Sequence, residues 1–273
     1  MEVQEELIEQ NQIEEESARF VKERALTTLS AAAFIISAAY GVLKIFDGSY
    51  PSAQATLIVI ESCVGIFFSL LPALILKIFK IRLSFSVQLI ITGFMLLAIV
   101  AGEAFEFYYK IFWWDGMLHV FSAFGIAYIA YCLTHFITRD SDLTRKFTFC
   151  IVGAVSVSLA MGMVWEVTEF TVDNICGTNM QKFMPETEPF FNGGNARETL
   201  EGNPGEFEEF FSKPEGYRYA LMDTMTDLVY CLAGVALFAV LAVFTKRSSI
   251  YDDAFVKEHS PRRRGGREAD GVA

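Results

Sequence analysis

Ionisable side chains recur at helical spacing inside segments that are otherwise apolar. Five pairs lie three or four positions apart: Glu103/Glu106, Asp115/His119, Glu166/Glu169, Glu169/Asp173 and Asp223/Asp227. Residues at this spacing share one helix face. Carboxylates and imidazoles on facing helices are how helical bundles build metal sites, although those sites use Glu-x-x-His where this chain has Asp-x-x-x-His. The pattern therefore indicates carboxylate, proton-transfer or metal chemistry.

Six apolar stretches carry these residues, and each is long enough to cross about 30 Å of hydrocarbon. They cover residues 25–46, 55–76, 85–106, 115–137, 147–173 and 220–245. We predict an all-α polytopic bundle of about six transmembrane helices in the region 25–245, including a long loop at 174–219. An acidic arm, 1–24, precedes the bundle, and a basic, disordered tail, 246–273, follows it.

The positive charges are unevenly divided between the two ends of these spans. Sixteen of the 22 Lys and Arg residues fall before span 1, between spans 2 and 3, between spans 4 and 5, or after span 6. Cytoplasmic flanks carry the excess of positive charge in membrane proteins. We therefore predict a cell-membrane protein with both termini cytoplasmic and the 174–219 loop outside.

The acidic residues of the spans gather toward the opposite, extracytoplasmic end. Nine carboxylates and one imidazole lie there: Glu61, Glu103, Glu106, Asp115, His119, Glu166, Glu169, Asp173, Asp223 and Asp227. Ionisable residues inside a membrane are expensive and mark function by default. So many acids in a poorly hydrated region need protons, bases or a cation to compensate them, and Lys44, Lys110 and Arg218 are too few.

A bound divalent ion would compensate these acids. Oxygen ligands with at most one imidazole favour Mg²⁺, Mn²⁺ or Ca²⁺ over zinc or iron. The predicted ligands are Asp115, His119, Glu166, Glu169, Asp223 and Asp227, with His119 and Glu169 as the candidate proton-transfer groups. The predicted supporting residues are Glu61, Glu103, Trp114, Trp165 and Asp173.

Structural interpretations stand beside the metal hypothesis. Trp113 and Trp114 fit an interfacial aromatic belt, and Asp223 fits an ordinary helix N-cap. Asp173 and Glu106 end their predicted helices, where they could simply be solvated. The deeper residues, His119, Glu166, Glu169 and Asp227, could instead hold helices together through buried hydrogen bonds.

Composition excludes several other classes of protein. The 273 residues are 53% hydrophobic, and the net charge of -11 would repel nucleic acid. The five cysteines show no CxxC spacing, which argues against a disulfide framework or a zinc knuckle. No P-loop, no Gly-x-Ser-x-Gly motif and no Cys/His nucleophile pair is present.

The ordered motifs resemble one family of membrane proteins. Gly102-Glu103, Phe107-Tyr108-Tyr109, Trp113 to His119, Trp165 to Glu169 with Asp173, Gly177 and Gln181, and Asp223 to Asp227 resemble the YjdF-like bacterial integral membrane proteins over residues 80–245. More distantly, Asp115/His119, Glu166/Glu169 and Asp227 with Gly234 resemble VanZ-like proteins, although Cys231 stands where those commonly have Asn. The resemblance implies a cell-envelope protein, with VanZ-like members linked to teicoplanin resistance.

The leading functional hypothesis is a site that binds, or acts on, a phosphate-bearing lipid or cell-wall precursor headgroup through the metal. A cation or proton transporter using the same acids is one alternative, although such sites usually lie near the bilayer midplane. A non-catalytic VanZ-like envelope or antibiotic-tolerance protein, whose long loop binds a partner, is the other. Membrane lipids are the expected surroundings in all three cases.

Overall fold

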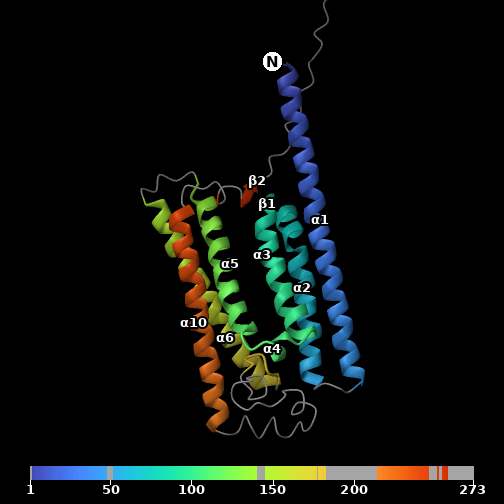
Figure 1. Cartoon of the computed structure of the whole chain (residues 1–273), viewed down its shortest axis with the longest axis vertical. Helices are drawn as coiled ribbons and strands as arrows, with labels where there is room; N and C mark the ends of the chain where they lie inside the picture. Colours follow the sequence, from blue (N-terminus) through green and yellow to red (C-terminus); the bar gives the residue numbers. More distant parts are fainter. Residues whose placement is uncertain are drawn as a thin grey trace, which may run out of the picture.

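Six long helices dominate the computed structural model, which describes residues 2–47, 52–139, 145–176, 178–182, 214–245, 251 and 254–257 (Figure 1). The elements in order are α1 (Glu2–Asp47), α2 (Ser52–Phe79), β1 (Ile81–Leu83), α3 (Phe85–Met95), η1 (Leu96–Ala104), α4 (Phe107–Lys110), α5 (Trp114–Ile137), α6 (Lys146–Cys176), α10 (Pro214–Thr245) and β2 (Phe255–Lys257). Six helical segments in this part of the chain are long and apolar enough to cross a membrane. The predicted all-α polytopic bundle is confirmed.

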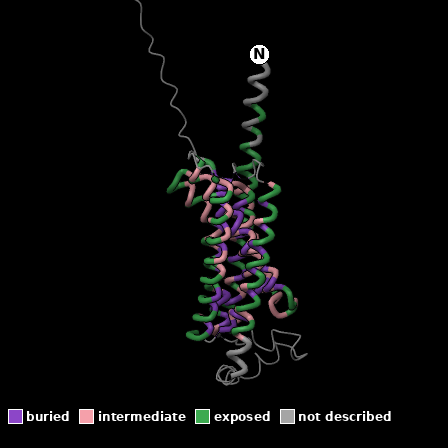
Figure 2. The backbone as a smooth tube through the Cα atoms, turned by 90° about the vertical axis from the view of Figure 1, so that its left-hand side faces the viewer, coloured by how far each residue is buried: buried purple, intermediate pink, exposed green. Residues whose placement is uncertain are grey.

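The helices form two groups, α1 with α2 and α3, and α5 with α6 and α10 (Figure 1). Within the first group, hydroxyls bridge α1 and α2: Ser30 Oγ lies 2.9 Å from Ser69 Oγ, and Ser62 Oγ lies 3.0 Å from Ser37 Oγ. In lipid, helices gain no hydrophobic driving force for association, so hydrogen bonds between small polar residues help to hold them together. Buried residues run along the inside of the bundle, whereas exposed ones face outward (Figure 2).

Gly234 sets how closely α10 approaches α5. A Cβ at this position would lie 2.3 Å from the carbonyl oxygen of Val120 and 3.1 Å from the Cβ of Ala123. Backbone cannot move aside as a flexible side chain can, so only glycine permits this approach. The same helix pair positions His119 against Asp227, so the site depends on it.

We therefore expect Gly234→Ala to lower the free energy of unfolding by about 1–3 kcal/mol through overpacking. Thermal unfolding of the purified protein measures this effect. The matched control is Gly93→Ala in α3, where an added Cβ would meet nothing within 4 Å. That control should be neutral or slightly stabilising, since alanine favours a helix more than glycine does. Equal midpoints for the two variants would contradict the close-packing argument.

The third predicted span departs from a regular α-helix. Residues 85–106 were expected to be one helix, but α3 ends at Met95 and continues as the π-helix η1 to Ala104. The chain then turns at Glu106, whose φ of 62° lies in the left-handed region, and α4 follows. π-helical turns are rare overall, but those that occur are often at functional sites. Here η1 carries Glu103 into the bundle.

Both ends of the described chain lie at one end of the bundle, and α4 lies at the other (Figure 1). Helix α1 runs from Glu2 through the predicted arm 1–24 into the first span, and Arg82 lies 3.5 Å from both Glu16 and Glu23. Strand β2, which lies within the predicted tail 246–273, pairs antiparallel with β1. The remainder of the tail and loop residues 183–213 lie outside the described residues.

Candidate functional site

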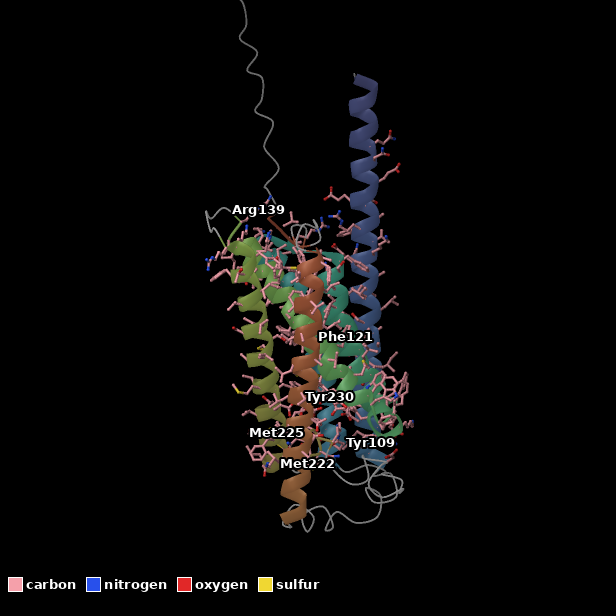
Figure 3. All side chains as sticks on the ribbon, turned by 60° about the vertical axis from the view of Figure 1, so that its left-hand side comes forward. Tyr109, Phe121, Arg139, Met222, Met225 and Tyr230 are labelled. Atoms are coloured by element: carbon pink, nitrogen blue, oxygen red, sulfur yellow. The ribbon has the colours of Figure 1, made fainter. Side chains whose placement is uncertain are left out.

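The predicted ligands come from three helices that meet at the α4 end of the bundle. Asp115 and His119 lie in the first two turns of α5, Glu166 and Glu169 lie near the end of α6, and Asp227 with Asp223 lies on α10. Figure 3 shows Met222 and Met225 of α10 and Tyr109 of α4 at this end, with Arg139 at the far end. The cluster therefore lies toward one face of the bundle.

Four of the six predicted ligands are buried. His119, Glu166, Glu169 and Asp227 are each less than a tenth exposed, and Glu166 is the most buried at 3%. Asp115 and Asp223 are partly exposed. On α6, Glu166, Glu169 and Asp173 continue the buried stripe that begins at Cys150, Ala154 and Ser158, so helical periodicity places them inside.

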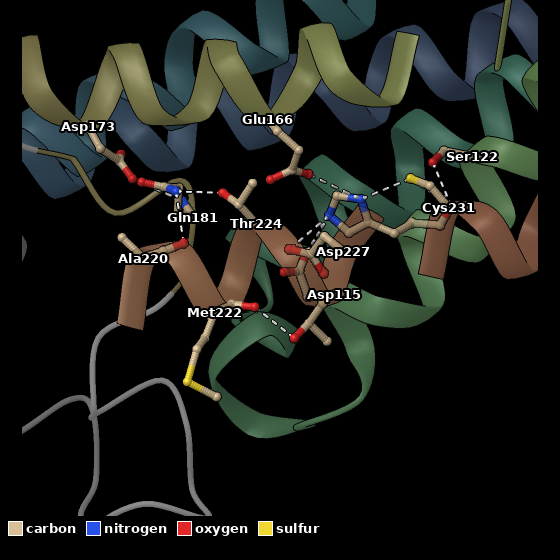
Figure 4. Close-up of polar contacts among 12 residues, drawn as sticks. Asp115, Ser122, Glu166, Asp173, Gln181, Ala220, Met222, Thr224, Asp227 and Cys231 are labelled. Carbon is tan, nitrogen blue, oxygen red and sulfur yellow. Dashed lines mark hydrogen bonds and ion pairs between the residues drawn. The ribbon is translucent and has the colours of Figure 1, made fainter. Parts of the chain in front are cut away.

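His119 lies among carboxylates from three helices, and Figure 4 shows Asp115, Glu166 and Asp227 converging at this point. Its Nε2 lies 3.6 Å from Asp227 Oδ2 and 3.7 Å from Asp115 Oδ1, and its Nδ1 lies 3.7 Å from Glu166 Oε1. Cys231 Sγ is 3.8 Å from Nδ1. The carboxylate distances exceed the roughly 2.7–3.2 Å of a good hydrogen bond, so none of the three acids holds the ring by a direct one.

The ligand atoms form three overlapping groups. Asp115, His119 and Asp227 form the first, His119, Glu166 and Glu169 the second, and Glu166, Asp223 and Asp227 the third, each with its atoms within 4.8 Å of one another. Two ligands about 2.0–2.4 Å from one ion lie roughly 3.0–3.8 Å apart. The separations around His119 fall in this range, which covers the first two groups.

Glu166 is the residue whose environment is hardest to explain by protein contacts alone. Both of its carboxylate oxygens are buried and make no close hydrogen bond among the described residues, although the Thr224 hydroxyl lies near enough to interact with the carboxylate. Burying such a group unpaired costs about 1–3 kcal/mol, and more when it is charged. The carboxylate lies 3.7 Å from His119 Nδ1 and belongs to two of the three ligand groups. Either a proton or a bound cation would compensate the burial of this carboxylate.

Two of the predicted supporting residues, Trp114 and Trp165, differ in how far they are buried. Trp114 is buried beside the site, with its ring 4.9 Å from that of Phe107. Trp165 is 46% exposed, so its supporting role stays a prediction. Glu106 pairs with Lys110 at 3.1 Å and stands apart from the ligands.

Asp173 anchors the segment 178–182, which folds back over the site. Its carboxylate accepts hydrogen bonds from Thr178 Oγ1 at 2.7 Å, from the Met180 N–H at 2.7 Å and from the Gln181 N–H at 3.0 Å. Gln181 Nε2 in turn donates to Thr224 Oγ1 of α10 at 3.1 Å (Figure 4). Asp173 is 2% exposed, which corrects the expectation that a helix-terminal acid is solvated.

Glu103 and Lys182 form a second polar cluster that the sequence did not indicate. Lys182 Nζ lies 2.6 Å from Glu103 Oε1, and Gln54 Nε2 donates to Glu103 Oε2 at 3.3 Å. Burial by itself would lower the pKa of Lys182, but the attraction of Glu103 and the neighbouring groups outweighs it and raises that pKa well above its ordinary value. Lys182 therefore stays cationic and compensates one of the nine acids.

Comparison with known proteins gives a family but no activity. Residues 31–248 match the model of a family described as predicted membrane protein (DUF2238). An uncharacterized protein of Thermotoga maritima is 32% identical over 101 residues, which are 37% of this chain and 51% of the relative. The chain thus spans about half the length of that relative. No solved structure matches. These matches do not bear on the VanZ-like resemblance, which stays a prediction.

Proposed function

The chain belongs to the family of predicted membrane proteins designated DUF2238, and on that premise we propose that this multi-pass membrane protein holds a divalent metal ion among His119, Glu166, Glu169, Asp115, Asp223 and Asp227. The ion would bind a phosphate-bearing headgroup of a lipid or cell-wall precursor. The observation that carries the proposal is the buried carboxylate of Glu166, which faces His119 and makes no close hydrogen bond among the described residues.

The charge of the cluster explains why a metal is needed for such a ligand. An acid-rich pocket repels phosphate, whereas a divalent ion held by it offers a positive face with open coordination positions. Mostly oxygen ligands with one imidazole favour Mg²⁺, Mn²⁺ or Ca²⁺. The excess of Lys and Arg at the opposite end of the spans favours an extracytoplasmic site. His119 and Glu169 are the candidate groups for any proton transfer.

Elemental analysis of the detergent-purified protein tests the metal site. We expect near-stoichiometric divalent metal in the wild type and loss of nearly all of it in Glu166→Gln, which keeps the shape of the side chain and removes its charge. The matched control is Glu106→Gln, because Glu106 lies at the same end of the bundle but pairs with Lys110. Metal-free wild type, or equal metal in both variants, would contradict the proposal and favour proton transport or a structural role.

Binding to lipid vesicles tests the headgroup part of the proposal separately. His119→Ala should weaken binding of a phosphate-bearing headgroup, because His119 belongs to two of the three ligand groups. If His119→Ala still held metal and bound the headgroup as the wild type does, the metal site would stand. The headgroup would then not be its ligand.

A further inference from the structure

Glu103 and two tyrosines enclose the ammonium group of Lys182. The ammonium contacts the carboxylate of Glu103 at 2.6 Å and lies 4.7 Å and 5.8 Å from the ring centroids of Tyr108 and Tyr109. A cation within about 6 Å of an aromatic face gains a cation–π attraction. We call the enclosure formed by Glu103, Tyr108 and Tyr109 the ammonium box.

Local backbone structure builds the ammonium box. The π-helix η1 turns Glu103 inward, where it is 3% exposed. Gly102 lets the ring of Tyr108 lie against η1, because a Cβ there would come within 2.3 Å of that ring. Gln54 of α2 donates to the second oxygen of Glu103 and fixes the orientation of the carboxylate. The box is thus organised by elements other than the segment that carries its occupant.

The backbone of Lys182 has a conformation that is unfavourable for a residue other than glycine. Its φ of 55° lies in the left-handed region, which costs a residue other than glycine about 1–2 kcal/mol. The segment 178–182 that carries it is joined to the bundle by side-chain contacts, chiefly through Asp173 and Gln181. Strain at a non-glycine residue is stored where surrounding contacts over-determine it.

The ammonium box lies at the depth where lipid headgroups lie. Glu103 stands one residue from the end of its span, and half-exposed Phe105, Phe112 and Trp113 flank it. Aromatic side chains at this position mark a membrane interface. A cavity of about 250 Å³ lies nearby between α2 and α6, lined by apolar Ala53, Leu57, Ile60 and Val172 with Thr56, Cys176 and Thr178. Ala53 and Thr178 adjoin Gln54 and Asn179, which touch each other beside the box.

We propose that the ammonium box is a binding site for a primary ammonium group, closed in this structure by the chain's own Lys182, which the headgroup of an aminophospholipid or a free primary amine displaces. The direct 2.6 Å contact requires an N–H donor, so methyl groups on the nitrogen would hold it away from Glu103. The residues of the box belong to none of the three ligand groups, and its test is made in EDTA so that it stands or falls without the metal.

Chemical rescue tests the chemistry of the ammonium box. Lys182→Ala should lower the thermal midpoint of the full chain in detergent, because Glu103 loses its counter-ion. Ethylamine should restore most of that loss, and tetramethylammonium should not. The double variant Lys182→Ala/Glu103→Gln should show no rescue. Lys110→Ala is the matched control, since its exposed pair with Glu106 leaves no enclosed site. Equal rescue by both cations, or none, would overturn the proposal.

Displacement of Lys182 in the wild type is tested by trypsin, which cleaves after lysine only when the side chain is accessible. In nanodiscs, phosphatidylethanolamine should speed cleavage after Lys182 several-fold relative to phosphatidylcholine. Acceleration by ethylamine in phosphatidylcholine discs alone would identify a free amine as the ligand. Unchanged cleavage with both amines would show that Lys182 is not displaced from Glu103 and would overturn the proposal. This measurement needs no variant to fold.

Discussion

Glu166→Met is expected to raise the midpoint of thermal unfolding in EDTA and to abolish the stabilisation that Mn²⁺ gives the wild type. The two oxygens of Glu166 are buried and make no close hydrogen bond among the described residues. Removing an unpaired buried polar group recovers about 1–3 kcal/mol. Methionine has a similar length and adapts to irregular space, so the replacement leaves no large cavity.

With Mn²⁺ bound, the wild type should become more stable than Glu166→Met. A ligand that binds only the folded state at 100 times its dissociation constant adds about 2.7 kcal/mol of stability. The wild type should gain this from Mn²⁺, whereas Glu166→Met should gain little, because two of the three ligand groups include Glu166. The measurement is the midpoint of each protein with EDTA and along a Mn²⁺ titration.

The two outcomes have different meanings. A lower midpoint for Glu166→Met in EDTA would show that the carboxyl group already stabilises the bundle through contacts in the metal-free protein, as the structural interpretation requires. A wild type that gains no stability from Mn²⁺, Mg²⁺ or Ca²⁺ would remove the metal proposal. Glu106→Gln should behave as the wild type throughout, because Glu106 pairs with Lys110 outside the ligand groups.

Local periodicity was enough to predict the helices and the faces that carry the cluster. The expected span 115–137 agrees with α5 from Trp114 to Ile137, and the expected 147–173 lies within α6. Apolar length and three-to-four spacing are properties of one segment. They also placed His119 and Glu166 inside, and both are buried. Which acids lie close enough to share a ligand group depends on how the helices rotate and cross, and the periodicity of a single segment does not specify this.

Contacts between distant segments could not be predicted in the same way. Lys182 lies 79 residues from Glu103, and Gln54 lies 49 residues from it. Lys182 sits in a segment that periodicity marks only as a loop, so its role as counter-ion depends on the path of 178–182 over the bundle. The π-helix at Glu103 also lacks a sequence signal, because its apolar residues are equally typical of an α-helix.

Asp173→Ala is expected to lower the free energy of unfolding by about 3–5 kcal/mol, as breaking a buried polar network does. Asp173 accepts three hydrogen bonds from the segment 178–182, and alanine would leave the Met180 N–H and the Gln181 N–H without this acceptor. The same loss should free Lys182 from Glu103 and so speed trypsin cleavage after Lys182. The measurements are thermal unfolding and the cleavage rate.

Two further variants separate the hydrogen bonds of Asp173 from its position at the end of α6. Asp173→Asn should be intermediate, because its oxygen can still accept from Thr178 and Met180 while its amide donor would face the Gln181 N–H. Asn174→Ala should be close to neutral, since exposed Asn174 bonds only within its own helix turn through Phe170 O among the described contacts. If Asp173→Ala were as stable as Asn174→Ala, the segment 178–182 would be held by other contacts, and Asp173 would not be its anchor. A large loss confined to Asp173 would show that one acid at the end of α6 holds in place the segment that carries the counter-ion of Glu103.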